Sequence, residues 1–324
     1  MNKQHQQTSP NQQRTRLRAD GVLLIDKPAG WTSHDVVARA RNLLGTRRVG
    51  HTGTLDPFAT GLLVLGINRA TRLIQFLAGD DKEYEAVARF GFATDTGDLT
   101  GTSLTAPESA ARLTTAQLNE AAAALRGHIQ QVPPMYSAKK IGGVKLYELA
   151  RQGAEIERQP VEVEIKALEI VEACAPTDEM TRDFVLRVVC SSGTYVRVLA
   201  EDLGQRVGIG AHLHALRRTR AGQFALAQAV TLERLAELAQ ANQIEQALLP
   251  MRVALPFVEI QVDAAEQRAL THGQAIRRAA QQPDGTLGKL CNARGELLAV
   301  ACYRAQTQAW QPRVVLCETP AQTT

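Results

Sequence analysis

The segment VGHTGTLDPFATGLL, residues 49–63, constrains the fold of this chain more than any other stretch. Its glycines allow backbone conformations and close approaches that a Cβ atom would make costly. Asp56 is followed by Pro57, which fixes its own φ and moves Asp56 away from the helical region. The segment therefore predicts a stiff, irregular loop that presents one carboxylate. An Asp-Pro turn whose carboxylate only caps a neighbouring backbone group would give the same pattern.

The composition is that of a globular chain. At 324 residues it is long enough for about two domains. The five cysteines are an odd number without CxxC spacing, which argues against a disulfide framework and against a structural zinc site. No apolar run approaches the ~20 residues that span a bilayer, and the Gln- and Arg-rich N-terminus lacks an apolar signal core. We expect a cytoplasmic protein with no membrane partner.

The distribution of positive charge is more informative than the net charge of +4. Basic residues form three separate clusters: Arg39, Arg41, Arg47 and Arg48; Lys139 and Lys140; and Arg217, Arg218 and Arg220. Separated clusters suit a long, folded nucleic acid better than a small anion. The alternative is that these side chains cover solvated helix faces.

The pattern of apolar residues predicts strands around scattered helices. Strands are expected at residues 21–26, 62–67, 82–93, 160–173 and 183–189. Helices are expected after Thr32, whose capping box is completed by Asp35, and at 70–77, 115–126, from 195 onward and at 229–249. Residues 128–146 show little periodicity and predict a long, partly mobile excursion. Such an arrangement, without regular βαβ alternation, favours an α+β fold with a mixed sheet.

The chain divides into a large unit and a small one. Residues 1–19 are polar and basic and predict a disordered tail. A main domain over 20–252 is expected to end in the segment from Pro250 to Pro256. Residues 253–318 then predict a small, mostly β module with glycine turns, followed by a tail at 319–324.

Asp56 is the first candidate for chemistry, as a nucleophile, a general base or a metal ligand. A metal would require further acidic residues, and the nearest dense pair, Asp95 and Asp98, is more typical of a turn. His51 could act as an acid or base, stack on a nucleobase, or bond within its own loop. Tyr84 begins an apolar strand face, where the default is a core position.

Arg197 stands in the first turn of a predicted helix, beside Tyr195 and among apolar neighbours. A guanidinium in dry surroundings normally pairs with a carboxylate. Asp56 is the partner that we expect.

Taken together and in this order, these segments resemble the bacterial tRNA pseudouridine-55 synthases, the TruB-type family. The matching elements are GVLLIDKPAGWTSHDVV (21–37), RRVGHTGTLDPFATGLL (47–63), KEYEAVARFGFATDTGDLTG (82–101), QVPPMYSAKKIGGVKLYELARQG (131–153) and CSSGTYVRVLAEDLG (190–204). The resemblance covers about residues 21–250, and Phe58 departs from the usual Leu. Over 272–277 the sequence HGQAIR is similar, more weakly, to a small RNA-binding PUA domain.

The resemblance implies a mainly antiparallel sheet flanked by helices, the pseudouridine synthase fold, with a PUA-like domain after it. It also implies that one T-loop uridine of tRNA is isomerised, exchanging its N1–C1′ bond for C5–C1′, without cofactor or metal. Because a base inside a folded loop cannot be reached, the uridine must be flipped out. A monomer that needs no protein partner is expected.

Roles follow from the same resemblance, residue by residue. Asp56 matches the catalytic aspartate, which attacks the substrate or assists cleavage of the glycosidic bond. Tyr84 matches a tyrosine at the flipped base, and Arg197 matches the arginine that pairs with the aspartate. His51 matches a histidine that fills the place of the flipped nucleotide. The remaining candidates for substrate contact are Arg48, Gly53, Thr54, Lys139, Lys140 and Tyr195, with the lysines on an insertion over 128–146 that clasps the RNA.

Other functions fit the sequence less well. A synthase that acts on another RNA, or through a guide RNA, would carry similar motifs. An RNA-binding protein without chemistry would not need Asp56, Tyr84 and Arg197 together. Mg²⁺-dependent phosphoryl transfer lacks both a P-loop and an acidic cluster.

Overall fold

The protein is described here by a computed structural model, and the described residues are 17, 19–104, 106–137, 140–141, 144–145, 156–174, 180–278 and 281–317. The predicted tail at 1–19 lies outside these ranges except at Leu17 and Ala19. The predicted tail at 319–324 lies wholly outside them.

The larger sheet has ten strands and is antiparallel except between β3 and β10. Its strand order is β12-β1-β3-β10-β4-β9-β8-β5, with β2 paired to β3 and β11 paired to β10. The bounds are β1 Gly21–Lys27, β2 Val49–His51, β3 Thr60–Ile67, β4 Lys82–Phe90, β5 Gly127–Gln131, β8 Val161–Ala173, β9 Arg182–Cys190, β10 Ala211–Ala221, β11 Phe224–Ala225 and β12 Leu248–Leu249. This is the predicted α+β fold with a mixed, mainly antiparallel sheet.

A smaller sheet occupies the C-terminal region, in the order β13-β15-β16-β17-β14. Its bounds are β13 Val258–Gln261, β14 Ile276–Arg277, β15 Leu287–Cys291, β16 Leu297–Arg304 and β17 Ala309–Val315, and a separate hairpin joins β6 Lys140–Ile141 to β7 Val144–Lys145. The helices are α1 Ser33–Leu44, α2 Ile74–Leu77, α3 Thr115–Ala123, α5 Val196–Arg206, α6 Leu232–Gln240 and α7 Ala264–Thr271. Within the described ranges, no helix is long and apolar enough to cross a membrane.

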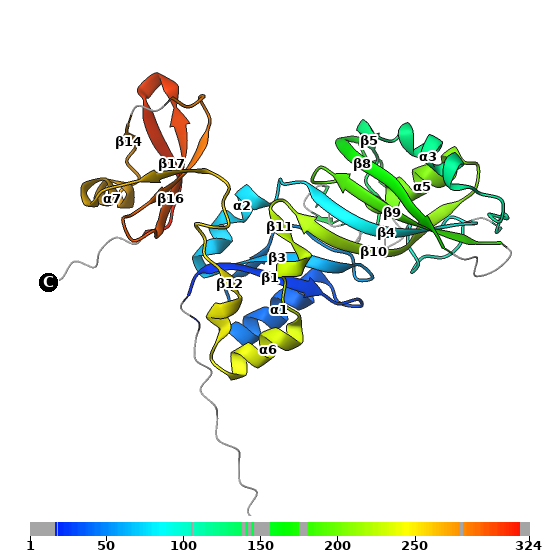
Figure 1. The fold of residues 1–324 in the computed structure, drawn as a ribbon, viewed down its shortest axis with the longest axis horizontal. Helices are drawn as coiled ribbons and strands as arrows, with labels where there is room; N and C mark the ends of the chain where they lie inside the picture. The colour runs from blue at the N-terminus through cyan, green and yellow to red at the C-terminus, as the bar shows by residue number, and fades with distance from the viewer. Residues whose placement is uncertain are drawn as a thin grey trace, which may run out of the picture.

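The two halves of the large sheet are buried differently, as their sequences require. Strands β1 and β3 are continuous apolar runs, because α1 and α6 cover one face and the C-terminal module covers the other. Strand β4 alternates between buried and less buried residues. One of its faces packs against α3 and α5, and the other carries charged side chains. Figure 1 shows α1 and α6 below the β1–β3 half and α3 and α5 at the far end of the sheet.

The residues at the start of α1 predicted the position of this helix correctly. Thr32 caps the helix and accepts a hydrogen bond from the Asp35 amide, while Asp35 bonds back to the Thr32 amide. Gly45 ends the helix in the left-handed conformation at φ 60°. The capping box was expected from the sequence, because it depends only on residues three apart.

The C-terminal module packs against the large sheet through a shared apolar core. Leu297, Val300 and Leu316 belong to the same buried cluster as Val22 and Leu62 of the large sheet. Across the same seam, the rings of Phe76 and Phe257 meet edge to face at 5.9 Å, and Arg69 Nη1 donates to the Leu316 carbonyl at 2.9 Å. The module is therefore docked on the large sheet rather than held by a linker alone.

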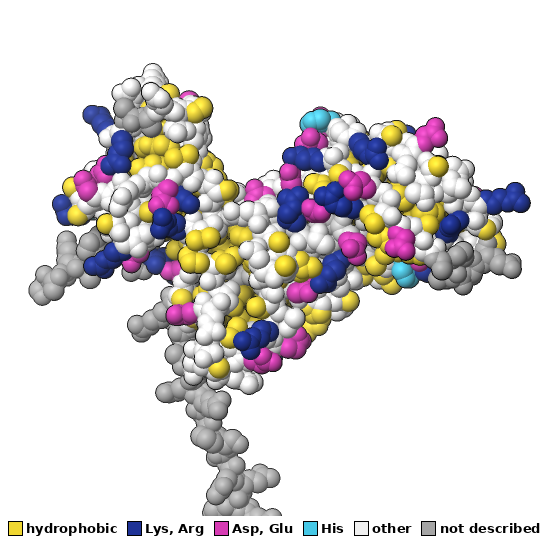
Figure 2. Space-filling model, in the orientation of Figure 1, with side chains coloured by type: hydrophobic (Ala, Val, Ile, Leu, Met, Phe, Trp, Pro, Cys, Tyr) yellow, Lys and Arg dark blue, Asp and Glu magenta, His cyan; other side chains and the backbone are white. Residues whose placement is uncertain are grey.

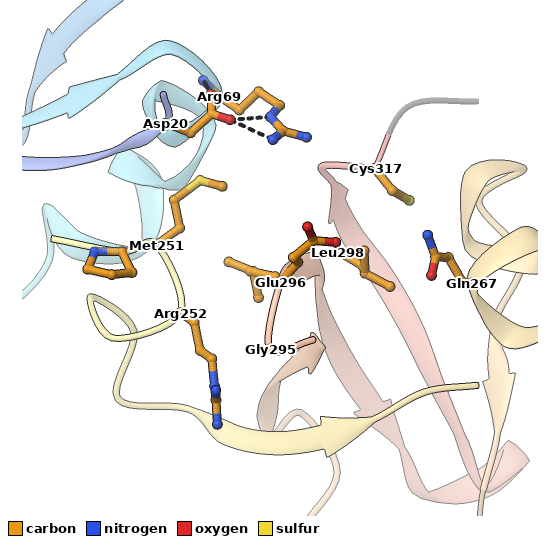
Figure 3. Close-up of a pocket in the computed structure, with 11 residues that line it drawn as sticks. Asp20, Arg69, Met251, Arg252, Gln267, Gly295, Glu296, Leu298 and Cys317 are labelled. Atoms are coloured by element: carbon orange, nitrogen blue, oxygen red, sulfur yellow. Dashed lines mark hydrogen bonds and ion pairs between the residues drawn. The ribbon is translucent and has the colours of Figure 1, made fainter. Parts of the chain in front are cut away.

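A cavity of about 450 Å³ remains at this seam (Figure 3). Its charged lining residues are already paired: Asp20 with Arg69, Arg252 with Glu259, and Glu296 with Asn292. It is a gap between two packed units, and these charged residues already have hydrogen-bond partners within the protein.

Two sequence expectations were wrong. Residues 229–249 are not one helix, because α6 ends at Gln240, Asn242 adopts a left-handed φ of 55° and Leu248–Leu249 pairs with β1 as an edge strand. The start of the 128–146 excursion is regular, because its first residues belong to β5, the edge strand that pairs with β8. Pairing between segments that are far apart in the sequence cannot be predicted from the local pattern of apolar residues in either segment.

The shared core predicts that the two units unfold together. Leu316→Ala removes a side chain that is 2% exposed and should cost about 2–5 kcal/mol of unfolding free energy. Chemical denaturation would be measured by the fluorescence of Trp310, which is buried in the module, in a variant that also carries Trp31→Phe. A second background, Trp310→Phe, would report on the large unit through Trp31.

Leu316→Ala should lower the midpoint by the same amount in both backgrounds, each compared with its own parent. A shift seen only through Trp310 would show that the module folds on its own.

Candidate active site

A cavity of about 280 Å³ opens where β3, β10 and β4 lie side by side in the middle of the large sheet. Its wall is formed by the loop after β2, the start of α5 and the segment at Ser137. Asp56, Tyr84 and Arg197, which are distant in the sequence, all line it.

Two of its lining residues, Arg218 and Tyr84, belong to a row of three paired residues on neighbouring strands. Arg218 of β10 is paired with Gly61 of β3 on one side and with Tyr84 of β4 on the other. Gly61 has φ 97°, and a Cβ there would lie 2.4 Å from the Arg218 carbonyl oxygen. Only glycine lets β3 approach β10 this closely, and that approach brings Arg218 to the cavity.

Arg197 is the most connected side chain of the site and is 3% exposed. Its Nε lies 3.0 Å from Asp56 Oδ2, so the expected ion pair is present. Nη1 donates to the Thr96 carbonyl at 2.7 Å, and Nη2 donates to the Tyr136 carbonyl at 2.7 Å. Nη1 also lies 3.7 Å from Asp98 Oδ2. The guanidinium thereby fixes the orientation of Asp56 in the cavity.

The charge on Asp56 is a balance of opposing effects. Burial raises the pKa of Asp56, the Arg197 cation lowers it, and the Asp98 carboxylate raises it again. The side chain is 33% exposed by surface area. However, that exposed part faces the cavity, so the surrounding protein still governs the pKa. The net effect raises the pKa of Asp56, and the Arg197 cation at hydrogen-bond distance favours the ionised form against burial.

Tyr84 and Arg218 complete the wall opposite Asp56. Burial raises the pKa of the Tyr84 hydroxyl, against the effect of the Arg218 cation, so the hydroxyl stays protonated at neutral pH. Arg218 is 2% exposed and donates to the carbonyls of Leu62 and Gly53, at 2.7 and 3.2 Å. Lys82 also lines the cavity, and burial lowers its pKa.

Several of the predicted site residues meet in this cavity: Asp56, Tyr84, Arg197, Gly53, Thr54 and Tyr195. His51, the last residue of β2, lies just before the lining segment, with its ring 5.7 Å from that of His34. Arg48 is exposed and precedes β2. Lys139 falls outside the described residues. Lys140 begins the β6 strand, but its side chain is not described.

The third basic cluster does not form the phosphate-binding surface that the sequence suggested. Arg218 is buried in the cavity wall, Arg217 pairs with Asp26 at 2.7 Å, and Arg220 pairs with Glu83 at 2.9 Å. Successive residues of a strand face opposite sides, so a run of arginines need not form one patch. Figure 2 accordingly shows basic and acidic side chains intermixed on the exposed face of the large sheet.

Sequence reasoning missed Lys82, Asp98 and Arg218 as parts of the site. Asp98 is 5% exposed and accepts hydrogen bonds from Thr96 and Thr100 within its own loop, as a turn aspartate would. Its approach to Arg197 depends on how that loop packs against α5. Among the described residues, no group of three or more His, Cys, Asp or Glu is placed to hold a metal ion.

Glu201 stands one helical turn after Arg197 and packs against the loop that carries Asp98. A Cβ built on Gly97 of that loop would lie 2.0 Å from Glu201 Oε1 and 3.3 Å from Arg197 Cβ. Burial raises the pKa of Glu201 from 4.5 to about 7, with Arg197 opposing and Asp202 and Asp98 adding to the rise.

Comparison with known proteins places this arrangement among RNA-modifying enzymes. Residues 41–196 match the N-terminal domain of TruB family pseudouridylate synthases, and residues 197–256 match the tRNA pseudouridylate synthase B C-terminal domain. The tRNA pseudouridine synthase B of Ralstonia nicotianae is 44% identical over 91% of this chain and 95% of its own length. That of Thermobifida fusca is 44% identical over 92% of this chain and 98% of its own length.

Solved structures show the same fold. The pseudouridine synthase chain of a Cbf5-Nop10-Gar1 complex has a TM-score of 0.69 and 25% sequence identity, and the alignment covers 92% of this chain and 85% of that one. A chain of an H/ACA RNP bound to a substrate RNA is similar in fold, with a TM-score of 0.68 and 24% identity over 92% of this chain and 85% of that one.

The raised pKa of Glu201 predicts a pH-dependent stability difference. The folded state binds the proton of the Glu201 carboxyl group more tightly than the unfolded state does. The stability that this proton contributes is therefore complete below pH 4.5 and is lost as the pH rises through about 7. Glu201→Gln stays neutral throughout. The Tm of the variant, relative to the native chain, should therefore rise across this window and then level off.

Glu120→Gln, on the exposed side of α3, is the matched control and should show no such rise. A Tm difference for Glu201→Gln that does not change with pH would contradict the assigned environment.

Proposed function

This chain belongs to the TruB family of pseudouridylate synthases, and we propose that it isomerises the T-loop uridine of tRNA, position 55, to pseudouridine. It is an isomerase. The observation that carries the proposal is the Asp56 carboxyl group, held by Arg197 at 3.0 Å in a cavity of about 280 Å³, which is large enough for one nucleoside but not for a paired duplex.

The size of the cavity supports base flipping. Extruding a nucleotide from a folded loop costs a few kcal/mol, which contacts made in the pocket must offset. Tyr84 would pack against the flipped uracil and offer its protonated hydroxyl. His51, which is half-buried and whose pKa is lowered mainly by burial, would enter the vacated place as a neutral ring.

Asp56 acts as the nucleophile in this proposal. Its carboxylate attacks the substrate as the N1–C1′ bond breaks, and the uracil turns so that C5 faces C1′. The C5–C1′ bond then forms as the bond between Asp56 and the substrate breaks, which regenerates the carboxylate. The proton on C5 leaves and N1 takes up a proton, so the product is an isomer of the substrate. No electrons are gained or lost overall, so the reaction needs no redox cofactor. Arg197 keeps the carboxylate charged while the RNA excludes water.

RNA outside the cavity would meet the exposed Arg48 and the segment over 128–146 with Lys139 and Lys140. We propose that this segment closes over the T-arm and that the C-terminal module is a PUA-like domain that adds RNA contacts. Phosphate contacts of this kind make binding strongly dependent on salt.

The proposal is tested with the purified chain alone and an unmodified tRNA transcript in EDTA. Pseudouridine should map to the T-loop uridine. Absence of product, or product elsewhere in the RNA, would overturn the proposal. Product formed by the chain alone would also support the expectation that no protein partner is required.

Asp56→Asn should abolish turnover and leave tRNA affinity within about twofold, because the change removes a charge but little volume. Single-turnover assays and filter binding measure the two quantities. A large loss of affinity with residual turnover would assign Asp56 a structural role instead.

Tyr84→Phe should fold normally and slow the single-turnover rate by about 10²-fold, the lower range for loss of a positioned proton-transfer group. Leu216→Ile, which alters an apolar wall residue of the same cavity, is the control and should change the rate little. An equal decrease in the single-turnover rate for both variants would show that the Tyr84 hydroxyl has no specific role in the reaction.

A further inference from the structure

The residue before Asp56 is held by a side chain from a distant segment. The Leu55 amide donates to Ser33 Oγ at 2.8 Å, and the same hydroxyl donates to the Leu55 carbonyl at 3.2 Å. Ser33 is 1% exposed and Leu55 is 3% exposed, so water cannot replace either bond. One hydroxyl thus satisfies both polar backbone groups of Leu55.

The residue after Asp56 is held by the same turn. The Gly30 amide donates to the Pro57 carbonyl at 2.8 Å, and Lys27 Nζ lies 3.3 Å from that oxygen. Lys27 is fully buried and also donates to the Trp31 carbonyl at 2.6 Å, which fixes the turn itself. Asp56 is therefore clamped on both sides by residues 27–33.

We propose that Ser33 is a positioning residue for Asp56. It touches neither the cavity nor the substrate, since it is absent from the lining, and it acts through Leu55. The inference rests on the proposed function, in which the Asp56 carboxylate attacks the substrate. Its physical basis is that a nucleophile loses much of its rate when its anchoring backbone can move by a fraction of an ångström.

The helix start at Ser33 offers a matched control. Thr32 is the neighbouring hydroxyl residue and caps α1, and its side-chain hydrogen bonds go to Asp35 rather than to Leu55. Thr32→Ala therefore weakens the same helix end without releasing the loop. Any effect of Ser33→Ala that passes through the helix would appear in Thr32→Ala as well.

The test compares Ser33→Ala, Thr32→Ala and the native chain in single-turnover assays with saturating enzyme, alongside tRNA binding. Ser33→Ala should be slower by about 10-fold to 100-fold with its Kd within about threefold, whereas Thr32→Ala should keep the native rate. The acidic limb of the Ser33→Ala pH–rate profile should also move to lower pH, because a released Asp56 is better hydrated.

A native rate in Ser33→Ala, or equal slowing in Thr32→Ala, would overturn the inference. If Ser33→Ala does not fold, Ser33→Cys replaces it, because its thiol is a weaker donor and acceptor. A rate at least about fivefold lower is then expected, and an unchanged rate would overturn the inference in the same way.

The two proposals fail differently. A native chain that makes no pseudouridine, or an Asp56→Asn variant that still makes it, defeats the proposed function. An active native chain with a fully active Ser33 variant defeats only the role of Ser33.

Discussion

The guanidinium of Arg197 joins segments that are far apart in the chain. It pairs with Asp56, bonds the carbonyls of Thr96 and Tyr136, and faces Asp98. A buried cation with so many acceptors is stable only if all of them are in place, and removing one partner of a buried pair is strongly destabilising. The loop after β2, the loop after β4, the segment after β5 and helix α5 are thereby fixed around one cavity.

The large sheet and the turn beside it fix the parts of the cavity that Arg197 does not contact. The row of Gly61, Arg218 and Tyr84 across β3, β10 and β4 places two of the residues that line the cavity, and the turn at 27–33 clamps the backbone on both sides of Asp56. Strands β1 and β3 are rigid because apolar layers cover both of their faces, one of them contributed by the C-terminal module. A reactive carboxylate on a loop is thus held by regular structure on every side, as a site of defined geometry requires.

The sequence predicted the structure correctly where the pattern was local, or where a charged residue among apolar neighbours had one evident partner. The Thr32–Asp35 capping box and the alternation in β4 are local patterns, and Asp56 was an evident partner for an arginine among apolar neighbours. It failed where a residue's role depends on a distant segment. Arg218 seemed part of a surface cluster because its acceptors, the carbonyls of Leu62 and Gly53, lie far away in the chain. Ser33 was read only as part of a helix start for the same reason, and Leu248–Leu249 was assigned to a helix because nothing local marks its pairing with β1.

The central claim is that Arg197 keeps the buried Asp56 ionised and aligned for attack. The most direct test is the pH dependence of the single-turnover rate in Arg197→Gln compared with the native chain, over pH values at which both remain folded. Since the Arg197 cation lowers the pKa of Asp56 against burial, the acidic limb of the variant should move to higher pH than that of the native chain. A limb at the same pH in both proteins would contradict the claim, even if the variant were slow.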